Sequence, residues 1–174
     1  MTGEYDSPNI LQQAARKIVG LAPVSAVLSR TMHHLDGPVL RRSHGRFSAA
    51  SLITGLPIIN LTAVGAKSGE PRTVPLVAIP DGEQLILIAS NWGKPRHPSW
   101  YYNVKANPEV TVGSTGRDGS PTRLYEAREL SGDEREAAWR KAVALYPGYA
   151  QYAKRNGGLA IPVVALRPKA AEFK

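Results

Sequence analysis

Two stretches of this sequence combine basic side chains with glycine-containing turns, which are the residue types that bind anions. In the first, a predicted strand runs into the turn 65–72, where Lys67, Ser68 and Arg72 could converge on one anion. Charged donors make the strongest hydrogen bonds to phosphate groups. The turn lacks the glycine spacing and the following helix of a phosphate-binding P-loop, and its composition also fits an ordinary basic hairpin.

The second stretch covers residues 89–101 and follows another predicted strand. The strand ends at Ser90 and Asn91, a loop with Lys94, Arg96 and no acidic residue follows, and a helix is predicted to begin near Pro98. The free backbone amides at a helix start also attract anions, and the two tryptophans of this stretch could cover a planar ring or serve as core anchors. Together the two stretches supply the candidate cofactor-binding residues Lys67, Ser68, Arg72, Ser90, Asn91, Trp92, Gly93, Lys94, Arg96 and Trp100.

Three tyrosines near the C-terminal end could form a substrate-binding wall. Tyr146, Tyr149 and Tyr152 recur at steps of three residues, which places them near one face of a helical turn. Tyrosines at this spacing also occur in cores and interfaces. With Ser90, they are the candidate catalytic residues.

Other kinds of catalytic site are poorly supported by the sequence. The chain has no cysteine, which excludes thiol nucleophiles and cysteine-ligated metals. His33 and His34 are adjacent, so they would point apart on a helix, and we expect no metal site. There is no Gly-x-Ser-x-Gly motif and no evident pair of catalytic carboxylates. This pattern suits a protein that holds a reactive cofactor.

Length and charge set the general class of protein. The chain has 174 residues, 43% of them hydrophobic, and a formal net charge of +8. These values predict one domain with its own core and an anionic partner. No apolar run reaches the roughly 18 residues of a membrane-spanning helix, and the start of the chain does not resemble a secretory signal. We therefore expect a cytoplasmic protein.

The elements that would position these residues are mainly short strands. Six strands are predicted, over 58–64, 72–79, 84–90, 109–114, 122–129 and 161–166, with turns at 66–71, 80–82 and 117–120. Three helices are predicted. The first covers 98–107, the second begins at a capping box formed by Ser131 to Glu134, and the third contains Tyr149 and Tyr152. Tight turns between strands favour an antiparallel sheet that closes as a barrel, in an α+β rather than an α/β arrangement.

Residues 1–50 are interpreted as a basic N-terminal arm, and residues 51–174 as the barrel domain. Apolar residues from Ile10 to Val19 recur at helical steps, and the basic residues Arg41, Arg42 and Arg46 follow. Such an arm is compatible with peripheral contact with the inner face of an anionic membrane, with a lid over the site, or with a dimer contact. Whether the protein is a monomer or a homodimer is left open.

Several ordered motifs resemble those of the deazaflavin-dependent nitroreductase family, an actinobacterial group of the flavin/deazaflavin oxidoreductases. The resemblance covers about residues 38–168. Its carriers are the segments 61–72, 89–90 with Gly93, 97–108, Tyr146-Pro147-x-Tyr149-x-x-Tyr152 and 161–164. Asn91-Trp92 and Lys94-Pro95-Arg96 depart from the family pattern.

The resemblance implies a six-stranded split β-barrel of the flavin-reductase-like, FMN-binding-like type with flanking helices. It implies reduced coenzyme F420, a deazaflavin with a phosphodiester and a polyglutamate tail, as the hydride donor to a quinone, nitro compound or activated alkene. Lys67, Ser68 and Arg72 would hold the phosphate and the start of the tail. Ser90 would face the deazaflavin ring, Trp100 would lie near the cofactor groove, and the tyrosines would form the substrate side.

Two alternatives remain open at this stage. The same barrel could bind FMN or haem, since a fold does not settle function. The protein could also be a non-enzymatic basic module that binds nucleic acid or a membrane surface. No nucleic-acid-binding motif is present and the basic residues are dispersed, so we expect no nucleic-acid partner.

Overall fold

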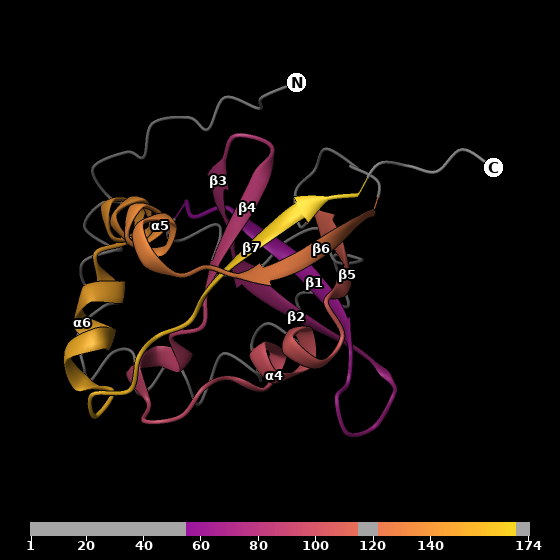
Figure 1. The fold of residues 1–174 in the computed structure, drawn as a ribbon, viewed down its shortest axis with the longest axis horizontal. Helices are drawn as coiled ribbons and strands as arrows, with labels where there is room; N and C mark the ends of the chain where they lie inside the picture. The colour runs from indigo at the N-terminus through magenta and orange to yellow at the C-terminus, as the bar shows by residue number, and fades with distance from the viewer. Residues whose placement is uncertain (1–54, 115–121, 170–174) are drawn as a thin grey trace.

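The described part of the chain, residues 55–114 and 122–169 of a computed structural model, is built around one curled antiparallel sheet (Figure 1). Its strands are β1 (Ile58–Val64), β2 (Pro71–Val77), β3 (Ile79–Asp81), β4 (Gln84–Ile88), β5 (Glu109–Ser114), β6 (Arg123–Glu129) and β7 (Val163–Pro168). Its helices are the short 3₁₀ turn η1 (Asn91–Gly93), α4 (Ser99–Ala106), α5 (Gly132–Leu145) and α6 (Gly148–Arg155). The predicted arm and the predicted turn at 117–120 lie outside these residues.

The strands follow the order β2-β1-β5-β6-β7-β4-β3, and each neighbouring pair is antiparallel. The predicted α+β antiparallel split barrel is confirmed, with seven strands in the described residues instead of six. The difference arises at Ala78, which is buried and separates β2 from β3. The single strand predicted over 72–79 therefore pairs with β1 before this bend and with β4 after it. One bent segment thus connects the two edges of the sheet and closes the barrel.

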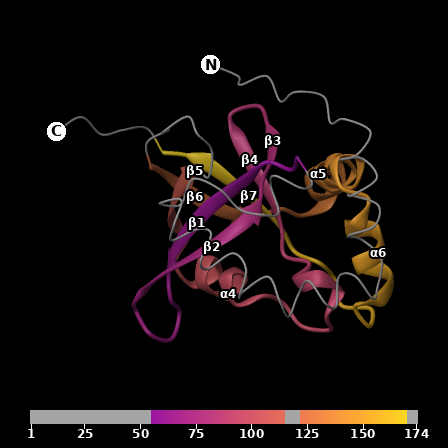
Figure 2. The same ribbon diagram turned by 180° about the vertical axis from the view of Figure 1, so that it is seen from behind.

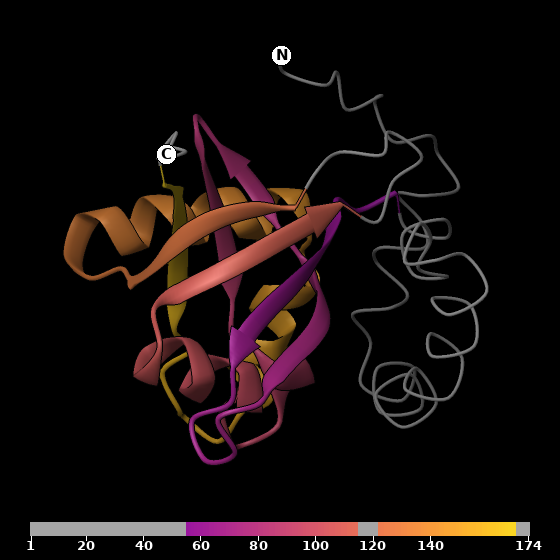
Figure 3. The ribbon, with the colours of Figure 1, turned by 90° about the vertical axis from the view of Figure 1, so that its right-hand side faces the viewer.

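The bend has its own hydrogen bond. The backbone amide of Ala78 donates to the carbonyl oxygen of Pro57 at 2.9 Å. This bond anchors the bend to the residue just before β1. Figure 3 views the curled sheet from the side and shows the strands wrapping around a common interior.

The core consists of two clusters, one on each face of the central strands. In β4, Leu87 packs in one cluster while Ile86 and Ile88 pack in the other. In β7, Val164 and Ala165 alternate in the same way. Because both faces of these two strands are buried, their sequences read as continuous apolar runs, unlike the alternating pattern of a sheet with one solvated face.

The helices cover different parts of the barrel. α4 contributes Trp100, Tyr101 and Val104 to the cluster inside the barrel, and α5 and α6 pack on the outer cluster. Figures 1 and 2 show α5 and α6 beside the sheet and α4 across one of its ends.

The start of α5 differs in detail from the predicted capping box. Ser131 occupies the N-cap position, but its side chain makes no capping hydrogen bond. Glu134, which would complete the box, instead accepts a hydrogen bond from Arg128 at 2.5 Å and lies 3.8 Å from Arg167. The two arginines on β6 and β7 therefore replace the capping interaction, since a carboxylate gains more from a cation than from a neutral amide.

Several segments that carry candidate site residues meet at one end of the sheet. Figures 1 and 2 show the β1–β2 turn, α4, η1 and the end of α6 at this end, opposite the β3–β4 hairpin. The fold thus brings the two anion-binding stretches and the end of α6 to one end of the barrel, with the β1–β2 turn and α6 on opposite sides of it (Figure 1).

Candidate functional site

The β1–β2 turn presents its cations to solvent on a tightly hydrogen-bonded backbone. Gly65 donates to Glu70 O and Gly69 donates to Gly65 O, both at 2.9 Å. The Ser68 hydroxyl accepts from the Glu70 amide at 3.3 Å, and a Cβ at Gly65 would lie 2.5 Å from that hydroxyl oxygen. The turn is therefore rigid, while Lys67 and Arg72 are exposed and available to an anion.

Asn103 of α4 and Asn107, the residue that caps the end of this helix, hold the turn from the side. The side-chain oxygen of Asn103 accepts from the Ala66 amide at 3.1 Å. The Asn107 side-chain amide donates to Val64 O at 3.2 Å. The position of the β1–β2 turn is thereby coupled to that of α4.

The loop after β4 begins with an unusual left-handed turn. Ser90 precedes η1, and its carbonyl oxygen accepts from the Gly93 amide at 2.9 Å. Asn91 and Trp92 have φ values of +45° and +59°. Such values are tolerated by asparagine but are rare for a bulky residue. The Asn91 side chain closes the loop by donating to Arg96 O at 2.9 Å.

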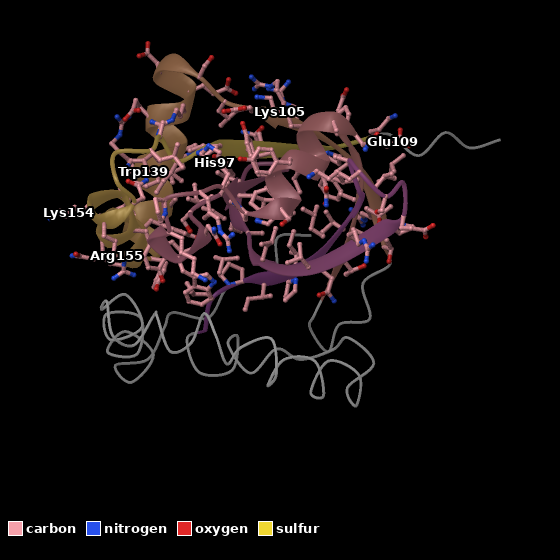
Figure 4. All side chains as sticks on the ribbon, turned by 90° about the horizontal axis from the view of Figure 1, so that it is seen from below. His97, Lys105, Glu109, Trp139, Lys154 and Arg155 are labelled. Carbon is pink, nitrogen blue, oxygen red and sulfur yellow. The ribbon has the colours of Figure 1, made fainter. Side chains whose placement is uncertain are left out.

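η1 packs closely on α6. A Cβ at Gly93 would lie 2.8 Å from Arg155 Nε and 3.0 Å from Tyr152 Cα. Glycine is therefore needed at 93, both for this approach and for the φ of +75°. The guanidinium of Arg155 donates to Trp92 O at 3.4 Å and lies 4.9 Å from the centre of the Tyr152 ring. Figure 4 shows Lys154 and Arg155 on the α6 side of the molecule and Lys105 on the side of α4.

The three tyrosines form one buried cluster. Tyr146, Tyr149 and Tyr152 are each at most 5% exposed, and their ring centres lie 5.1 to 6.3 Å apart. The hydroxyls of Tyr146 and Tyr152 are 2.8 Å apart and hydrogen-bonded. The ring of Tyr146 folds against Gly148, where any Cβ would clash with it. Tyr149 and Tyr152 lie on α6 at the predicted helical spacing, whereas Tyr146 is the extended residue that ends α5. All three side chains are part of the core, and their role as a substrate-binding wall stays a prediction.

Burial keeps these hydroxyls protonated. Desolvation is the largest cause that raises the pKa of Tyr146, Tyr149 and Tyr152 above the ordinary tyrosine value of 10.0. A buried phenolate would be poorly solvated, so the neutral form is favoured. At neutral pH the three groups can therefore act as hydrogen-bond donors and not as bases.

The remaining candidates differ in their surroundings. Arg96 is exposed and Lys94 is half-buried on the loop after η1. Trp100 is 8% exposed and packs inside the barrel with Leu61 and Leu166, as expected of a core anchor. Its contact with a cofactor stays a prediction.

Three residues at this end of the fold were not assigned a role from the sequence. Asn103 and Asn107 hold the β1–β2 turn, and Arg155 joins η1 to α6. Arg155 stands three residues after Tyr152, so helical spacing alone could have placed it on the tyrosine face. Asn103 and Asn107 bond to residues that are 37 and 43 positions away in the sequence, so no local sequence pattern predicts these contacts.

The described residues contain no group of three or more His, Asp or Glu side chains that could hold a metal ion. None of the helices formed by these residues combines the length and the apolar character needed to cross a membrane.

The fold defines a small α+β split-barrel protein with exposed cations on one turn and a separate buried aromatic cluster. Residues 35–168 match the family described as F420H(2)-dependent quinone reductase. The match spans more than half of the chain, and the chain belongs to this family. The resemblance to deazaflavin-dependent oxidoreductases is confirmed.

Individual relatives agree with the family assignment. The chain is 45% identical over 79 residues to an F420H(2)-dependent quinone reductase of Mycobacterium tuberculosis, a match that covers 45% of this chain and 52% of the relative. The chain thus spans about half the length of the first curated relatives it matches. A solved F420-H2 dependent reductase (FDR-A) is 45% identical, with a TM-score of 0.56 over 64% of this chain and 94% of its own.

A second solved relative is described as a domain-swapped dimer. It is 37% identical, with a TM-score of 0.57, and the match covers 84% of this chain and all of that chain.

Proposed function

We propose that this protein is an oxidoreductase that uses reduced coenzyme F420 to reduce a quinone. The observation that carries the proposal is membership of the F420H(2)-dependent quinone reductase family over residues 35–168, the segment that contains the whole described barrel end. Nitro compounds and activated alkenes are further electron-poor, planar acceptors that the same site could take.

The donor set of the β1–β2 turn fits the anionic part of this cofactor. Lys67 and Arg72 offer exposed cationic donors, and the hydrogen-bonded backbone between them fixes the points from which the two side chains extend. The sequence from Gln84 to Pro108 contains no Asp or Glu, so the neighbouring loop adds Lys94 and Arg96 without an opposing charge. A phosphodiester and a polyglutamate tail are the ligands that such a surface favours.

The acceptor is proposed to bind on the side of Ser90 and the tyrosine cluster. When bound, reduced F420 supplies a hydride, and the protein's part is to hold the acceptor at a distance of about 3–3.5 Å from it. Negative charge then develops on the acceptor oxygen. One of the hydroxyls of Tyr146 and Tyr152 donates its proton to the other. The hydroxyl that accepts keeps its own proton and can donate it to the acceptor oxygen. A well-placed donor in a dry site contributes about 3–4 kcal/mol to the transition state.

The first test is a fluorescence titration of the purified chain with F420, run beside FMN at moderate salt. We expect F420 to bind more tightly than FMN. Anaerobic mixing of the protein with F420H2 and menadione should then oxidise the deazaflavin. A preference for FMN, or a haem-coloured preparation, would contradict the proposed cofactor. Binding of neither ligand would favour the non-enzymatic basic module.

The partners of the whole protein are also proposals. The solved relative described as a domain-swapped dimer favours a homodimer, which light scattering of the full chain would test. We also propose a cytoplasmic location, with peripheral contact between the basic arm and an anionic membrane. This contact predicts co-sedimentation with anionic vesicles that is lost when residues 1–50 are removed.

A further inference from the structure

The contact between η1 and α6 points to a determinant of acceptor size. Trp92 is half-buried and packs against the cluster that contains the three tyrosines. Its ring centre lies 6.3 Å from that of Tyr152, and the two planes are tilted by 59°. The indole therefore covers Tyr152, which is 3% exposed, on the side that η1 occupies.

Trp92 is held there against its own backbone preference. A φ of +59° is unfavourable for a bulky side chain, so the conformation persists only because neighbouring groups stabilise it. Three contacts do so. Gly93 allows the close approach to α6, the Asn91 side chain closes the loop onto Arg96, and Arg155 donates to the carbonyl oxygen of Trp92 itself.

Arg155 acts on both partners of this contact. Its guanidinium lies over the Tyr152 ring at 4.9 Å while it donates to Trp92 O. The planar guanidinium can stack and donate at the same time, which a lysine ammonium cannot reproduce. Arg155 is therefore placed to fix the indole relative to Tyr152.

We propose that Trp92 limits the size of the acceptor admitted beside Tyr152, and that Arg155 is the positioning residue that holds Trp92 in place. This proposal rests on the proposed function, because it assigns the tyrosine side of the site to the acceptor. An indole that is fixed in position excludes a second fused ring more effectively than a mobile one. The chain should therefore favour single-ring quinones over two-ring quinones.

The test compares two probes, 1,4-benzoquinone and menadione, in the full-length protein. For each variant, kcat/KM with F420H2 is measured for both acceptors, and their ratio is the readout. Trp92→Ala is expected to shift the ratio toward menadione by about tenfold, a typical size effect of a hydrophobic pocket. Trp92→Phe should shift it less, and it keeps the test valid if Trp92→Ala folds poorly.

The role of Arg155 is tested by non-additivity. Arg155→Ala alone should shift the ratio in the same direction by about threefold to fivefold, and Arg155→Lys should recover only part of the wild-type ratio. Added to Trp92→Ala, however, Arg155→Ala should change the ratio by less than about twofold, because its target is already gone. Lys154→Ala is the matched control, since it removes the neighbouring exposed cation of α6 and should leave the ratio unchanged.

The outcomes separate this inference from the proposed function. If the wild type does not oxidise F420H2 with either quinone, the proposed function fails, and equilibrium dialysis of each quinone against the same variants then decides the size determinant directly. An unchanged ratio in both Trp92 variants would overturn the role of Trp92. Fully additive effects of Trp92→Ala and Arg155→Ala would overturn the positioning role of Arg155.

Discussion

The β1–β2 turn and the tyrosine cluster lie on opposite sides of the barrel and are built in opposite ways. The turn exposes its cationic side chains and is held by hydrogen bonds to backbone atoms. The cluster buries its side chains, and the hydroxyls of Tyr146 and Tyr152 are bonded to each other. The cations of the turn are therefore open to a ligand in solution, whereas the rings of the cluster are shielded from solvent.

This difference separates affinity from selectivity. Exposed cations on a rigid turn attract an anion of many shapes, because electrostatic attraction tolerates variation in the rest of the ligand. A buried aromatic cluster discriminates by shape, because every misfit leaves a void or an unpaired polar group. Within the proposed function, cofactor affinity therefore belongs to the turn and acceptor selectivity to the cluster.

The largest loss of stability is expected for a substitution at the contact between η1 and α6. Gly93→Ala places a Cβ 3.0 Å from the backbone of Tyr152 at a φ of +75°. The left-handed backbone and the clash together should lower the free energy of unfolding by about 3 kcal/mol, measured by urea denaturation.

Gly82 provides the matched control for this variant. It has a φ of +63°, but an added Cβ would have no atom within 4 Å. Gly82→Ala should therefore cost only the conformational part, about 1 kcal/mol. Equal losses in the two variants would show that the close packing of η1 on α6 contributes nothing.

The next effect concerns the turn. Removing both cations with Lys67→Ala and Arg72→Ala should weaken F420 binding by at least about 100-fold, because each hydrogen bond from a charged donor contributes roughly 1.5–3 kcal/mol. The fluorescence titration measures this loss, which should shrink as the salt concentration rises.

Arg123→Ala removes an exposed cation of β6 outside this group and should leave F420 binding unchanged. Unchanged affinity in the double variant would contradict the assignment of the turn. A loss of menadione turnover at saturating F420H2 would contradict the division between the two regions.

The sequence predicted local features better than contacts between distant segments. The strands over 58–64 and 109–114 were placed at their observed bounds, because turn residues flank them. The helix over 98–107 and the helical spacing of Tyr149 and Tyr152 were also recovered, whereas Tyr146 lies before that helix. The division at Ala78 was missed because an apolar strand looks the same whether it pairs with one neighbour or changes from one to another.

The site residues show the same limit. Lys67 and Arg72 could be chosen from composition, because an exposed turn acts through its own side chains. Arg155, Asn103 and Asn107 act through backbone atoms of other segments, such as Trp92 O and the Ala66 amide. A backbone partner leaves no trace in side-chain chemistry, so the sequence alone could not reveal these contacts.

A smaller effect is expected for the hydroxyl pair. Tyr146→Phe leaves the buried Tyr152 hydroxyl without its partner at 2.8 Å and should lower the free energy of unfolding by about 1.5 kcal/mol. Replacing both tyrosines by Phe should cost less than the sum of the single variants, because no unpaired hydroxyl remains. Additive losses, measured by a double-mutant cycle, would show that the two hydroxyls do not interact. F420 affinity should stay within about twofold throughout.

Alkaline pH should weaken the cluster. Burial raises the pKa of Tyr149 above its ordinary value of 10.0, so the folded protein retains this proton where the unfolded chain releases it. The contribution to stability is therefore complete below pH 10 and is lost as pH rises above it. In Tyr149→Phe, the fall in unfolding free energy between pH 10 and 11 should be smaller than in the wild type by about 1 kcal/mol. Equal slopes would place the Tyr149 hydroxyl in water.

The smallest effect is expected at the support of the turn. Asn103→Ala removes the acceptor of the Ala66 amide, while Lys67 and Arg72 remain. A looser turn must be ordered when the ligand binds, so F420 affinity should fall by about threefold, consistent with one net hydrogen bond of about 0.5–1.5 kcal/mol. Asn107→Ala should have a similar effect through Val64 O, and Ser99→Ala, on the exposed start of the same helix, should have none. All four proteins are compared at a temperature where each is folded, so that a change in affinity reports the turn and not global stability. If Asn103→Ala lowered stability without changing affinity, the turn would be rigid without α4, and the cations alone would determine cofactor binding.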